Sequence, residues 1–496
     1  MRMMSPDIGT LHFVGIGGIG MSGIAILLKS LGYDVQGSDM ADNANVVRMR
    51  GLGVRISIGH DADNIRGRNG ELPAAVIISS AVKDDNVELM AARSEKVPVV
   101  QRAEMLAELM RLKSSVAVAG THGKTTTTAM VGQMLDQAGL DPTVVNGGIV
   151  NAYGTNTRFG HSEWMVVEAD ESDGSFIRLP ATVAVVTNID PEHMEHYGSF
   201  DRVKKAYKRF VLNLPFHGYA LLCIDHPEVQ TLAAQVSDRK VITYGFNPQA
   251  DIRAQNIRPN SEGSIFDVVF AAWLCDDGQE QIIKDIKLSM LGRHNVQNSL
   301  VALGVAKEMG VSADKMKAAM ANFGGVKRRF TKTGEVGGIT IIDDYAHHPV
   351  EIDVVLKTAR DAVKQAGGNV IAVMQPHRYT RLNDLYEEFC CCFNDADHVI
   401  ITDVFEAGEK PIDGVDKNYL VEGLKAHGHR SVQALNGDLA DILADIAGAG
   451  DYIIMMGAGN ITAMAYDLPD KLKHLSIPSE EGIHESLPDS LFRGNA

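Results

Sequence analysis

The chain has 496 residues, of which 45% are hydrophobic and 22% are charged, and its formal net charge is −16. A chain of this length is too long to fold around a single hydrophobic core, so we expect about three domains. The strong negative charge argues against a protein that binds nucleic acid without regard to sequence. It shows neither an export-signal pattern nor an apolar stretch long enough to cross a membrane, so we expect a cytoplasmic protein with no membrane partner.

Segments with strand and helix patterns alternate along most of the chain, which predicts an α/β fold of parallel sheets flanked by helices. Changes in composition divide the chain into domains at residues 1–113, 114–325 and 326–474, followed by a polar tail at 475–496. The tail is rich in Ser, Glu and Pro, so we expect it to be poorly ordered.

The first domain opens with a glycine-rich turn. An expected strand at 11–15 runs into Gly15, Gly17 and Gly20, which fit the pattern G-x-G-x-x-G, and Asp39 follows a second strand. Taken alone, this pattern indicates a Rossmann domain that binds NAD, with Asp39 on the ribose 2′-hydroxyl. Because the glycines only let the backbone approach a diphosphate, a UDP-sugar suits the same turn. Further strands are expected near 34–38, 76–80 and 98–100.

The second domain begins with another glycine-rich loop, directly after an apolar strand at 116–119. The loop reads Gly120-Thr121-His122-Gly123-Lys124-Thr125-Thr126, which predicts a strand that turns into a helix N-terminus around a nucleotide phosphate. In such a loop Lys124 reaches the β- and γ-phosphates and the Thr125 hydroxyl binds Mg²⁺. Strict Walker spacing requires a glycine where this chain has Val118, so the loop is a tightened variant. It predicts ATP-dependent chemistry.

Two acidic segments follow, each at the end of an apolar strand. The first delivers Glu168, a candidate Mg²⁺ ligand, and the second delivers Asp190 and His193. Open α/β sheets bind their ligands at the carboxyl ends of strands. Two such ends beside a phosphate loop predict a centre that holds two metal ions between phosphates and protein.

Strands of the third domain are expected near 339–343, 369–375, 398–404 and 452–457. Seven motifs spread over all three domains then match one family in order. They are Gly15 to Ala25 (GIGGIGMSGIA), Gly120 to Thr128 (GTHGKTTTT), Glu168 to Phe176 (EADESDGSF), Asn188 to Gly198 (NIDPEHMEHYG), Gly292 to Asn298 (GRHNVQN), Asp343 to Pro349 (DDYAHHP) and Gln375 to Arg381 (QPHRYTR). With these motifs the chain resembles the Mur ligases over nearly its whole length.

The resemblance implies a three-domain Mur ligase architecture. An N-terminal Rossmann-like domain would bind the UDP-substrate, a central P-loop ATPase-like domain would bind ATP, and a C-terminal Rossmann-like domain would bind the amino acid. It also implies an ATP- and Mg²⁺-dependent ligase of peptidoglycan precursor synthesis that forms an acyl phosphate on UDP-N-acetylmuramate and releases ADP and phosphate. The GIGGIGM and ESDGSF forms favour the members that add L-alanine over those that add a tripeptide.

The resemblance further implies roles for single residues, of which Lys124, His193, His347, His377 and Arg378 would be catalytic. Thr125, Glu168 and His193 would hold Mg²⁺. Contacts to ATP would come from Gly120, Thr121, His122, Gly123, Lys124, Thr125, Thr126, His294, Asn295, Asn298, Arg329 and Asp344, with Asn295 as the base contact. UDP would contact Gly15, Gly17, Gly20, Asp39 and His60. The amino-acid pocket would consist of Tyr345, His347, His377, Arg378 and Arg381.

Several points stay open at this stage. Either His347 or His377 accepts a proton from the amine, and either Arg328 or Arg329 contacts phosphate. Lys208 lies near the place where many Mur ligases carry a carbamylated lysine. We expect the third domain to close about the segment near Gly325, although a glycine linker without functional motion is the alternative.

Two other classes of function compete with the ligase. A nicotinamide dehydrogenase explains the first glycine turn, but it leaves Lys124 and Glu168 without a role. A regulatory module that binds ATP explains the phosphate loop without a two-metal centre. For the ligase we expect a monomer or a homodimer.

Overall fold

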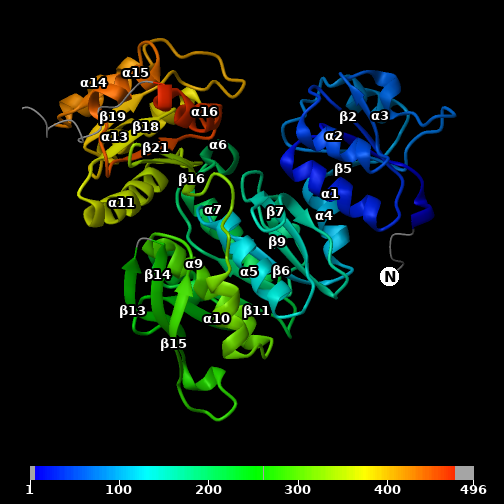
Figure 1. Ribbon diagram of the computed structural model, residues 1–496. Coiled ribbons are helices and arrows are strands. Elements are labelled where there is room, and N and C mark those ends of the chain that lie inside the picture. The colour runs from blue at the N-terminus through cyan, green and yellow to red at the C-terminus, as the bar shows by residue number, and fades with distance from the viewer. Residues whose placement is uncertain (1–5, 261, 475–496) are drawn as a thin grey trace, which may run out of the picture. The chain divides into compact units, whose positions relative to one another are not determined.

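A computed structural model describes residues 6–260 and 262–474 of the chain. These residues group into two compact units that divide between Lys327 and Arg328, and each unit has sheets of its own (Figure 1). The tail predicted at 475–496 lies outside the described residues. Within those residues, no helix is long and apolar enough to span a membrane.

The first sheet consists of short parallel strands: β1 (Leu11–Val14), β2 (Val35–Asp39), β3 (Arg55–Ile58), β4 (Ala75–Ile78) and β5 (Val99–Gln101). Their order is β3-β2-β1-β4-β5, with Leu11 of β1 paired to Val35 on one side and Ala75 on the other. The expected strands of this domain are found within one or two residues of their predicted positions. Strand β3 has no counterpart among them, because its alternating polar residues form no continuous apolar run.

Among the described residues, four α-helices accompany this sheet: α1 (Ile19–Ser30), α2 (Ala44–Gly51), α3 (Val87–Ser94) and α4 (Arg102–Met110). Helices α2 and α3 begin where asparagine side chains, Asn43 and Asn86, accept hydrogen bonds from the first backbone N–H groups. Helix α1 begins inside the first glycine turn, after Gly18. Its N-terminus is therefore placed at the carboxyl end of β1.

The second sheet has ten strands within the described residues: β6 (Ser114–Ala119), β7 (Thr143–Val150), β8 (Thr155–Arg158), β9 (Trp164–Glu168), β10 (Val183–Val186), β11 (Tyr219–Cys223), β12 (Lys240–Gly245), β13 (Ile252–Asn260), β14 (Gly263–Phe270) and β15 (Gln281–Leu288). Their order is β15-β14-β13-β12-β11-β10-β6-β9-β7-β8. Neighbours from β13 to β7 run parallel, whereas β8, β14 and β15 pair in antiparallel fashion. Strand β6 thus lies between β9 and β10, and the segments that follow these three strands meet at one edge of the sheet.

The second sheet is covered by helices α5 (Lys124–Gln137), α6 (Met194–Tyr197), α7 (Phe200–Leu212), α8 (Pro227–Gln235), α9 (Arg293–Glu308) and α10 (Ala313–Ala321). Buried side chains such as Met130 of α5 and Leu300 of α9 pack in one core with apolar residues of the strands. In a separate core, Phe176 packs against the rings of Tyr207 and Phe210 from α7. Both faces of the parallel strands are apolar, as expected for strands buried on both sides.

The unit that begins at Arg328 contains a sheet of β16 (Thr331–Val336), β17 (Ile339–Asp344), β18 (Val370–Met374), β19 (His398–Ile401), β20 (Val432–Ala434) and β21 (Tyr452–Met456). The order is β16-β17-β21-β18-β19-β20, and every pair is parallel except β16 with β17. The helices are α11 (Pro349–Ala366), α12 (Tyr379–Asp384), α13 (Tyr386–Cys391), α14 (Lys417–Ala426), α15 (Leu439–Ile446) and α16 (Ile461–His474).

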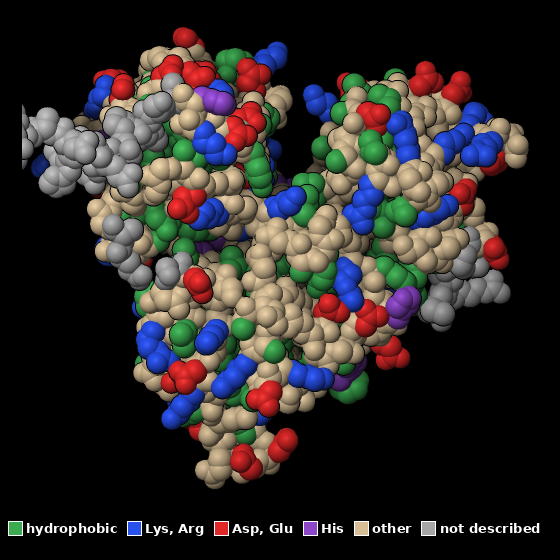
Figure 2. All heavy atoms as spheres, viewed as in Figure 1, with side chains coloured by type: hydrophobic (Ala, Val, Ile, Leu, Met, Phe, Trp, Pro, Cys, Tyr) green, Lys and Arg blue, Asp and Glu red, His purple; other side chains and the backbone are tan. Residues whose placement is uncertain are grey.

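These sheets confirm the predicted α/β fold with mainly parallel strands. In the third domain the four expected strands correspond to β17, β18, β19 and β21, whereas the edge strands β16 and β20 are additional. On the face seen in Figure 2, acidic and basic side chains are interspersed over the surface.

Candidate active site

The loop after β6 has the geometry predicted for a phosphate-binding loop. It runs from Gly120 to Gly123, and α5 begins at Lys124. Both glycines have positive φ, 138° and 81°. A Cβ atom at Gly120 would lie 1.9 Å from the Thr187 hydroxyl oxygen, and one at Gly123 would lie 2.9 Å from the Asn298 amide oxygen. The loop therefore requires glycine at both positions, for backbone conformation and for space.

Lys124 lies folded over this loop. Its Nζ donates hydrogen bonds to the carbonyl oxygens of Gly120 at 2.6 Å and Thr121 at 2.9 Å, and to Glu171 Oε1 at 2.9 Å. Burial opposes the charge of this amine, but the carboxylates of Glu171 and Glu168 outweigh that effect and raise the pKa of Lys124. The site therefore holds a mostly buried, charged lysine directly beside the loop.

The side chains of Thr125 and Glu168, two of the predicted metal ligands, are in direct contact. The Thr125 hydroxyl donates to Glu168 Oε1 at 3.1 Å, and the backbone N–H of Gly147 donates to Oε2 at 2.7 Å. A Cβ atom at Gly147 would lie 2.6 Å from the carboxylate, so this glycine leaves the room that Glu168 occupies. The contact arises because β9 delivers Glu168 beside the start of α5.

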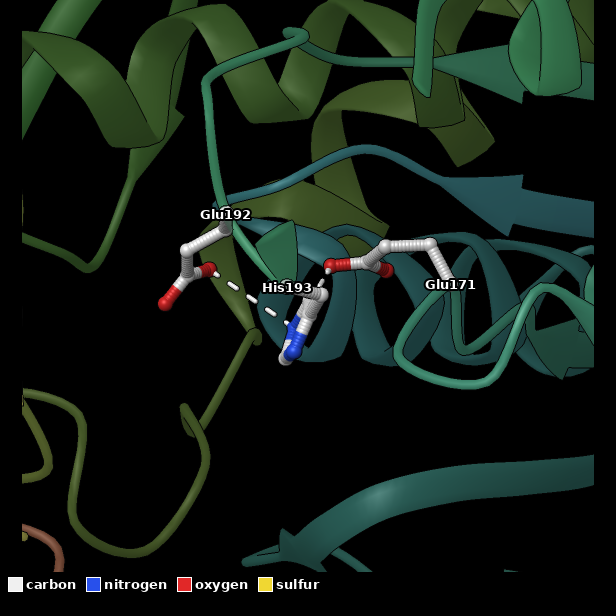
Figure 3. Close-up of side chains that lie close together, drawn as sticks. All are labelled: Glu171, Glu192 and His193. Atoms are coloured by element: carbon white, nitrogen blue, oxygen red, sulfur yellow. Dashed lines mark ion pairs between the residues drawn. The ribbon is translucent and has the colours of Figure 1, made fainter. Parts of the chain in front are cut away.

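The third predicted ligand, His193, lies in a neighbouring cluster with Glu171 and Glu192 (Figure 3). One ligand atom from each residue lies within 4.8 Å of the others. His193 Nε2 is 3.8 Å from Glu171 Oε1 and 3.9 Å from Glu192 Oε2. The histidine lies between the two carboxylates in the close-up.

Glu171 is the most buried carboxylate of this cluster, with 3% of its surface exposed. Burial raises its pKa to about 7, even though Lys124 favours the ionised form. Its Oε2 atom has no hydrogen-bond partner among the described residues. An unsatisfied carboxylate oxygen beside a second carboxylate and an imidazole suits a divalent cation, because Mg²⁺ prefers oxygen ligands. The donor set therefore fits the predicted metal.

Helix α9 brings the predicted adenine-side residues to the same region. The Asn298 amide lies against Gly123 of the phosphate loop. Asn295 is buried, and its Nδ2 donates to the Leu291 carbonyl at 2.8 Å. His294 belongs to the first turn of the same helix.

His122 and Asp190 connect the loop to the segment after β10. The backbone N–H of His122 donates to the Asn188 side chain at 2.7 Å. The Asp190 carboxylate lies 3.5 Å from His122 Nε2 and 3.2 Å from His226 Nε2. These contacts tie the loop to the end of β10, and His226 is a neighbour that the sequence motifs do not include.

Lys208 lies apart from this constellation. It is on α7, and its Nζ donates to the Gln235 side chain at 3.2 Å near the surface. The preceding residue, Tyr207, is fully buried. Tyr207 therefore lies on the side of α7 that packs into the core, while Lys208 contacts Gln235 at the end of α8.

The glycine turn after β1 is held by the carboxylate predicted to receive UDP. Asp39 Oδ2 accepts a hydrogen bond from the Gly17 backbone N–H at 2.8 Å. A Cβ atom at Gly20 would lie 3.2 Å from the side chain of Arg102, which in turn forms an ion pair with Asp170 at 3.2 Å. Arg102 is a cation beside the turn that no motif singled out, because a lone arginine at a helix start carries no pattern.

In the unit that begins at Arg328, Asp344 lies at the end of β17. It is buried and accepts hydrogen bonds from the backbone N–H groups of Phe330 at 2.7 Å and Ala346 at 2.8 Å. Burial raises the pKa of Asp344 to about 6, although Arg329 favours its ionised form. Two guanidinium groups lie over the ring of the adjacent Tyr345. The Cζ atom of Arg328 is 4.7 Å from the ring centroid, and that of Arg329 is 5.3 Å from it.

The Arg328 guanidinium is held by hydrogen bonds to two backbone carbonyl groups of its own unit. Arg328 Nη2 donates to the carbonyl oxygens of Gly457 at 2.5 Å and Gly459 at 3.3 Å. These contacts hold the start of this unit against the loop after β21. Arg328 therefore has a local structural partner for its guanidinium.

Three of the predicted amino-acid pocket residues of this unit, Tyr345, His347 and His377, form one cluster of rings. The centroid of the His377 ring lies 5.7 Å from that of the His347 ring. On its other contact, the His377 ring stacks on Phe405 with 5.5 Å between the centroids. Burial, reinforced by His347 and the nearby arginines, lowers the pKa of His377 to about 4, so this ring is neutral near pH 7. Arg381 Nη1 lies 3.4 Å from His377 Nδ1.

His347 has a different environment. Its Nδ1 lies 2.9 Å from the Tyr345 carbonyl oxygen. A carbonyl oxygen can only accept, so Nδ1 of His347 carries a proton. Arg378, the residue after His377, has φ of 71°, and its backbone N–H donates to the Phe405 carbonyl at 2.9 Å. Tyr345, His347, His377 and Arg381 thus lie together, and Arg378 directly follows His377 in the chain. Their roles stay predictions.

Three family models match this chain in order. They describe a Mur ligase family catalytic domain at residues 10–114, a Mur ligase middle domain at 118–306, and a Mur ligase glutamate ligase domain at 328–459. Together they span most of the described residues.

Full-length relatives carry a more specific name. The chain is 58% identical over 471 residues to the UDP-N-acetylmuramate–L-alanine ligase of Bradyrhizobium sp. (strain ORS 278), covering 95% of this chain and 99% of that protein. It is 59% identical over 484 residues to the ligase of the same name from Paramagnetospirillum magneticum, covering 97% and 100%.

Solved structures agree in fold. The UDP-N-acetylmuramate–alanine ligase of Thermotoga maritima is 28% identical and has a TM-score of 0.76, covering 94% of this chain and 100% of that one. A MurF ligase of Thermotoga maritima in complex with ADP is 19% identical with a TM-score of 0.58, covering 82% and 90%. The second likeness concerns the fold alone.

Proposed function

Since the chain belongs to the Mur ligase family, we propose that it is the ATP-dependent ligase that joins L-alanine to the carboxylate of UDP-N-acetylmuramate. The observation that carries this proposal is 58–59% identity, over nearly the whole length of both chains, to ligases of that name. The reaction belongs to peptidoglycan precursor synthesis, and we place it in the cytoplasm.

The first step activates the substrate carboxylate. A carboxylate is a poor acceptor for an amine, because oxide is a poor leaving group. The carboxylate oxygen attacks the γ-phosphorus of ATP, the bond to the ADP oxygen breaks, and an acyl phosphate forms. The main obstacle is charge, since an anion approaches a polyanion, and catalysis of such transfers depends on positioning and neutralisation. Lys124, the first residue of α5 beside the phosphate loop, supplies the cation.

Thr125, Glu168 and His193 are the proposed holders of Mg²⁺, and Glu171 and Glu192 lie in the same cluster as His193. When bound, the metal supplies positive charge that neutralises phosphate oxygens and aligns them. Glu171 keeps Lys124 charged and in place beside the loop. His294, Asn295, Asn298 and Asp344 are proposed to bind the nucleoside part of ATP.

The second step forms the amide. The amine of L-alanine attacks the acyl carbon, a tetrahedral intermediate forms, and phosphate leaves with the bonding pair of electrons. Arg378 and Arg381 have forked donors suited to the carboxylate of the amino acid. His347 and His377 stay the candidates for the proton acceptor, and Nδ1 of His347 is already protonated toward a carbonyl oxygen.

Measured ADP formation tests the proposal directly. The enzyme is supplied with ATP, Mg²⁺ and UDP-N-acetylmuramate, and then with L-alanine, glycine, L-serine or a tripeptide in turn. We expect the highest kcat/KM with L-alanine and no turnover with the tripeptide. Oxygen-18 placed in the substrate carboxylate is expected in the released phosphate. ADP formation that ignores the amino acid, or phosphate without label, contradicts the ligase.

A matched pair of variants addresses which arginine contacts phosphate. We expect Arg329→Ala to raise KM for ATP by about tenfold, the value of one charge-assisted contact. Arg328→Ala removes the hydrogen bonds to the Gly457 and Gly459 carbonyls, so we expect a lower melting temperature with KM for ATP changed less than threefold. Steady-state kinetics and thermal unfolding of both variants distinguish the two roles, and the reverse pattern would exchange them.

A further inference from the structure

A fully buried carboxylate lies in the first domain, away from the phosphate loop. Glu88, on α3, has 0% of its surface exposed. Its Oε2 accepts hydrogen bonds from His12 Nε2 at 2.8 Å and the Ser38 hydroxyl at 2.7 Å. Its Oε1 accepts from Asn64 Nδ2 at 3.0 Å and lies 3.0 Å from His60 Nδ1. Burying a charge is costly unless it is paired in this way.

These hydrogen bonds keep the carboxylate ionised. Burial disfavours the charge, but the donors around Glu88, His12 first among them, outweigh it and lower its pKa to about 2. An ionised carboxylate has no proton to give and acts only as an acceptor. Every neighbour within hydrogen-bond distance of Glu88 must therefore donate.

The hydrogen bonds of Gln36 and His12, which lead to Glu88, agree with this conclusion. Arg55 donates to Gln36 Oε1, so the amide nitrogen of Gln36 faces the other way, toward the Ile65 carbonyl at 2.9 Å and His12 Nδ1 at 3.3 Å. His12 Nδ1 thus accepts, and its proton resides on Nε2, which faces Glu88. The hydrogen bonds among Gln36, His12 and Glu88 are therefore all formed only when each donor points toward Glu88.

The same reasoning fixes the tautomer of His60. Because Glu88 accepts, His60 Nδ1 carries the proton, and in the neutral ring the lone pair resides on Nε2. The side chain of His60 is 22% exposed, whereas that of Glu88 is 0% exposed. No residue of the described parts of the chain forms a hydrogen bond with His60 Nε2. The ring therefore presents an acceptor at the partly exposed end of a buried network.

The location of this acceptor points to a ligand. His60 follows β3, and the backbone N–H of Gly59 donates to the Asp39 carbonyl at the end of β2 at 2.8 Å. The Asp39 side chain in turn holds Gly17 of the glycine turn after β1. His60 is thus at the carboxyl ends of neighbouring parallel strands, where open α/β sheets bind their ligands.

We propose that Glu88 is a positioning residue for the nucleotide half of the substrate: it holds His60 with the proton on Nδ1, so that Nε2 accepts a hydrogen bond from the ligand. This proposal rests on the proposed function. The phosphates of UDP have no hydrogen to donate, so the partner is a ribose hydroxyl or the uracil imide N–H. Glu88 itself does not touch the substrate.

A double-mutant cycle tests whether Glu88 acts through His60. The variants are Glu88→Gln, His60→Ala and the combination, with Glu95→Gln as a control, since Glu95 is an exposed glutamate at the end of the same helix. We expect Glu88→Gln and His60→Ala each to raise KM for UDP-N-acetylmuramate about tenfold, with kcat within twofold and KM for ATP unchanged. The double variant is expected to be no worse than His60→Ala.

Two results would overturn the proposal. One is an effect of Glu88→Gln on KM that is as large in the His60→Ala background as in the wild type. The other is a fall in kcat with KM for the nucleotide-sugar unchanged, which indicates general damage to the fold.

A second measurement does not depend on any variant that replaces Glu88. Nitrogen-15 NMR of the wild-type enzyme with labelled histidine, with the His60 signal identified from its loss in His60→Ala, reports the protonated nitrogen. We expect a proton on Nδ1 in the free enzyme and a shift of the Nε2 signal when UDP is added. A neutral His60 ring with its proton on Nε2 would overturn the proposal. A wild-type enzyme that shows the expected tautomer but forms no ADP in response to L-alanine would contradict only the ligase function.

Discussion

Lys124→Ala is expected to lower kcat for ADP formation by about 10³-fold or more, because a cation on the transferred phosphoryl group is worth that much in phosphoryl transfer. Lys124 is charged and mostly buried, and its Nζ lies within 2.9 Å of two loop carbonyl oxygens and Glu171 Oε1. Steady-state ADP release measures the loss. Lys204→Ala, a change at a lysine of α7 that pairs with Asp201, is the matched control and is expected to keep wild-type kcat.

The same variant has a predictable effect on stability. The pKa of Glu171 is raised to about 7 even with Lys124 beside it, so removal of the amine raises it further. A raised carboxyl pKa means that the folded state binds a proton that the unfolded state releases above about pH 4.5. The unfolding free energy of Lys124→Ala relative to wild type should therefore fall as pH rises from 5 to 8.

Adding Glu171→Gln to Lys124→Ala separates the two effects. The double variant no longer has the buried carboxylate that Lys124 pairs with. Its melting temperature should therefore recover and lose the extra pH dependence, while kcat stays low. Thermal unfolding at pH 5 and pH 8 checks this expectation. Near-normal kcat in Lys124→Ala, with the protein folded, would remove the lysine from the mechanism.

The phosphate loop shows how far local pattern predicts a site. An apolar strand, two glycines and a lysine at a helix start specify backbone conformation within a few residues, and the structure has that conformation at Gly120 and Gly123. Likewise, continuous apolar runs predicted the parallel strands well. Edge strands such as β16, with half-exposed residues, carry a weaker pattern.

Residues that depend on packing between distant segments could not be read in this way. Glu171 is one of several acidic residues in its segment, and only the fold shows that it is the one buried beside Lys124. Glu88 looks like an ordinary helix-surface glutamate in the sequence, yet His12, 76 residues away, shares a hydrogen bond with it. Long-range partners of this kind leave no local spacing to recognise.

Glu168→Gln is expected to lower kcat by about 10²-fold or more and to raise the Mg²⁺ concentration needed for half-maximal rate at least tenfold. The carboxylate accepts from both the Thr125 hydroxyl and the Gly147 N–H, so a glutamine must turn its NH₂ group toward one of these donors. The variant thus loses both the negative charge and one hydrogen bond, with almost no change in volume.

The control for Glu168→Gln is Glu163→Gln, which changes an exposed glutamate just before the same strand and should alter neither kcat nor the Mg²⁺ requirement. Glu171→Gln provides the sharper comparison, because it removes charge from the cluster with His193 and Glu192. If both clusters hold metal, both variants should shift the Mg²⁺ requirement; if Thr125 and Glu168 alone do so, only Glu168→Gln should. A wild-type Mg²⁺ dependence in Glu168→Gln would exclude this carboxylate as a ligand and leave the cluster of Glu171, Glu192 and His193 as the candidate metal site.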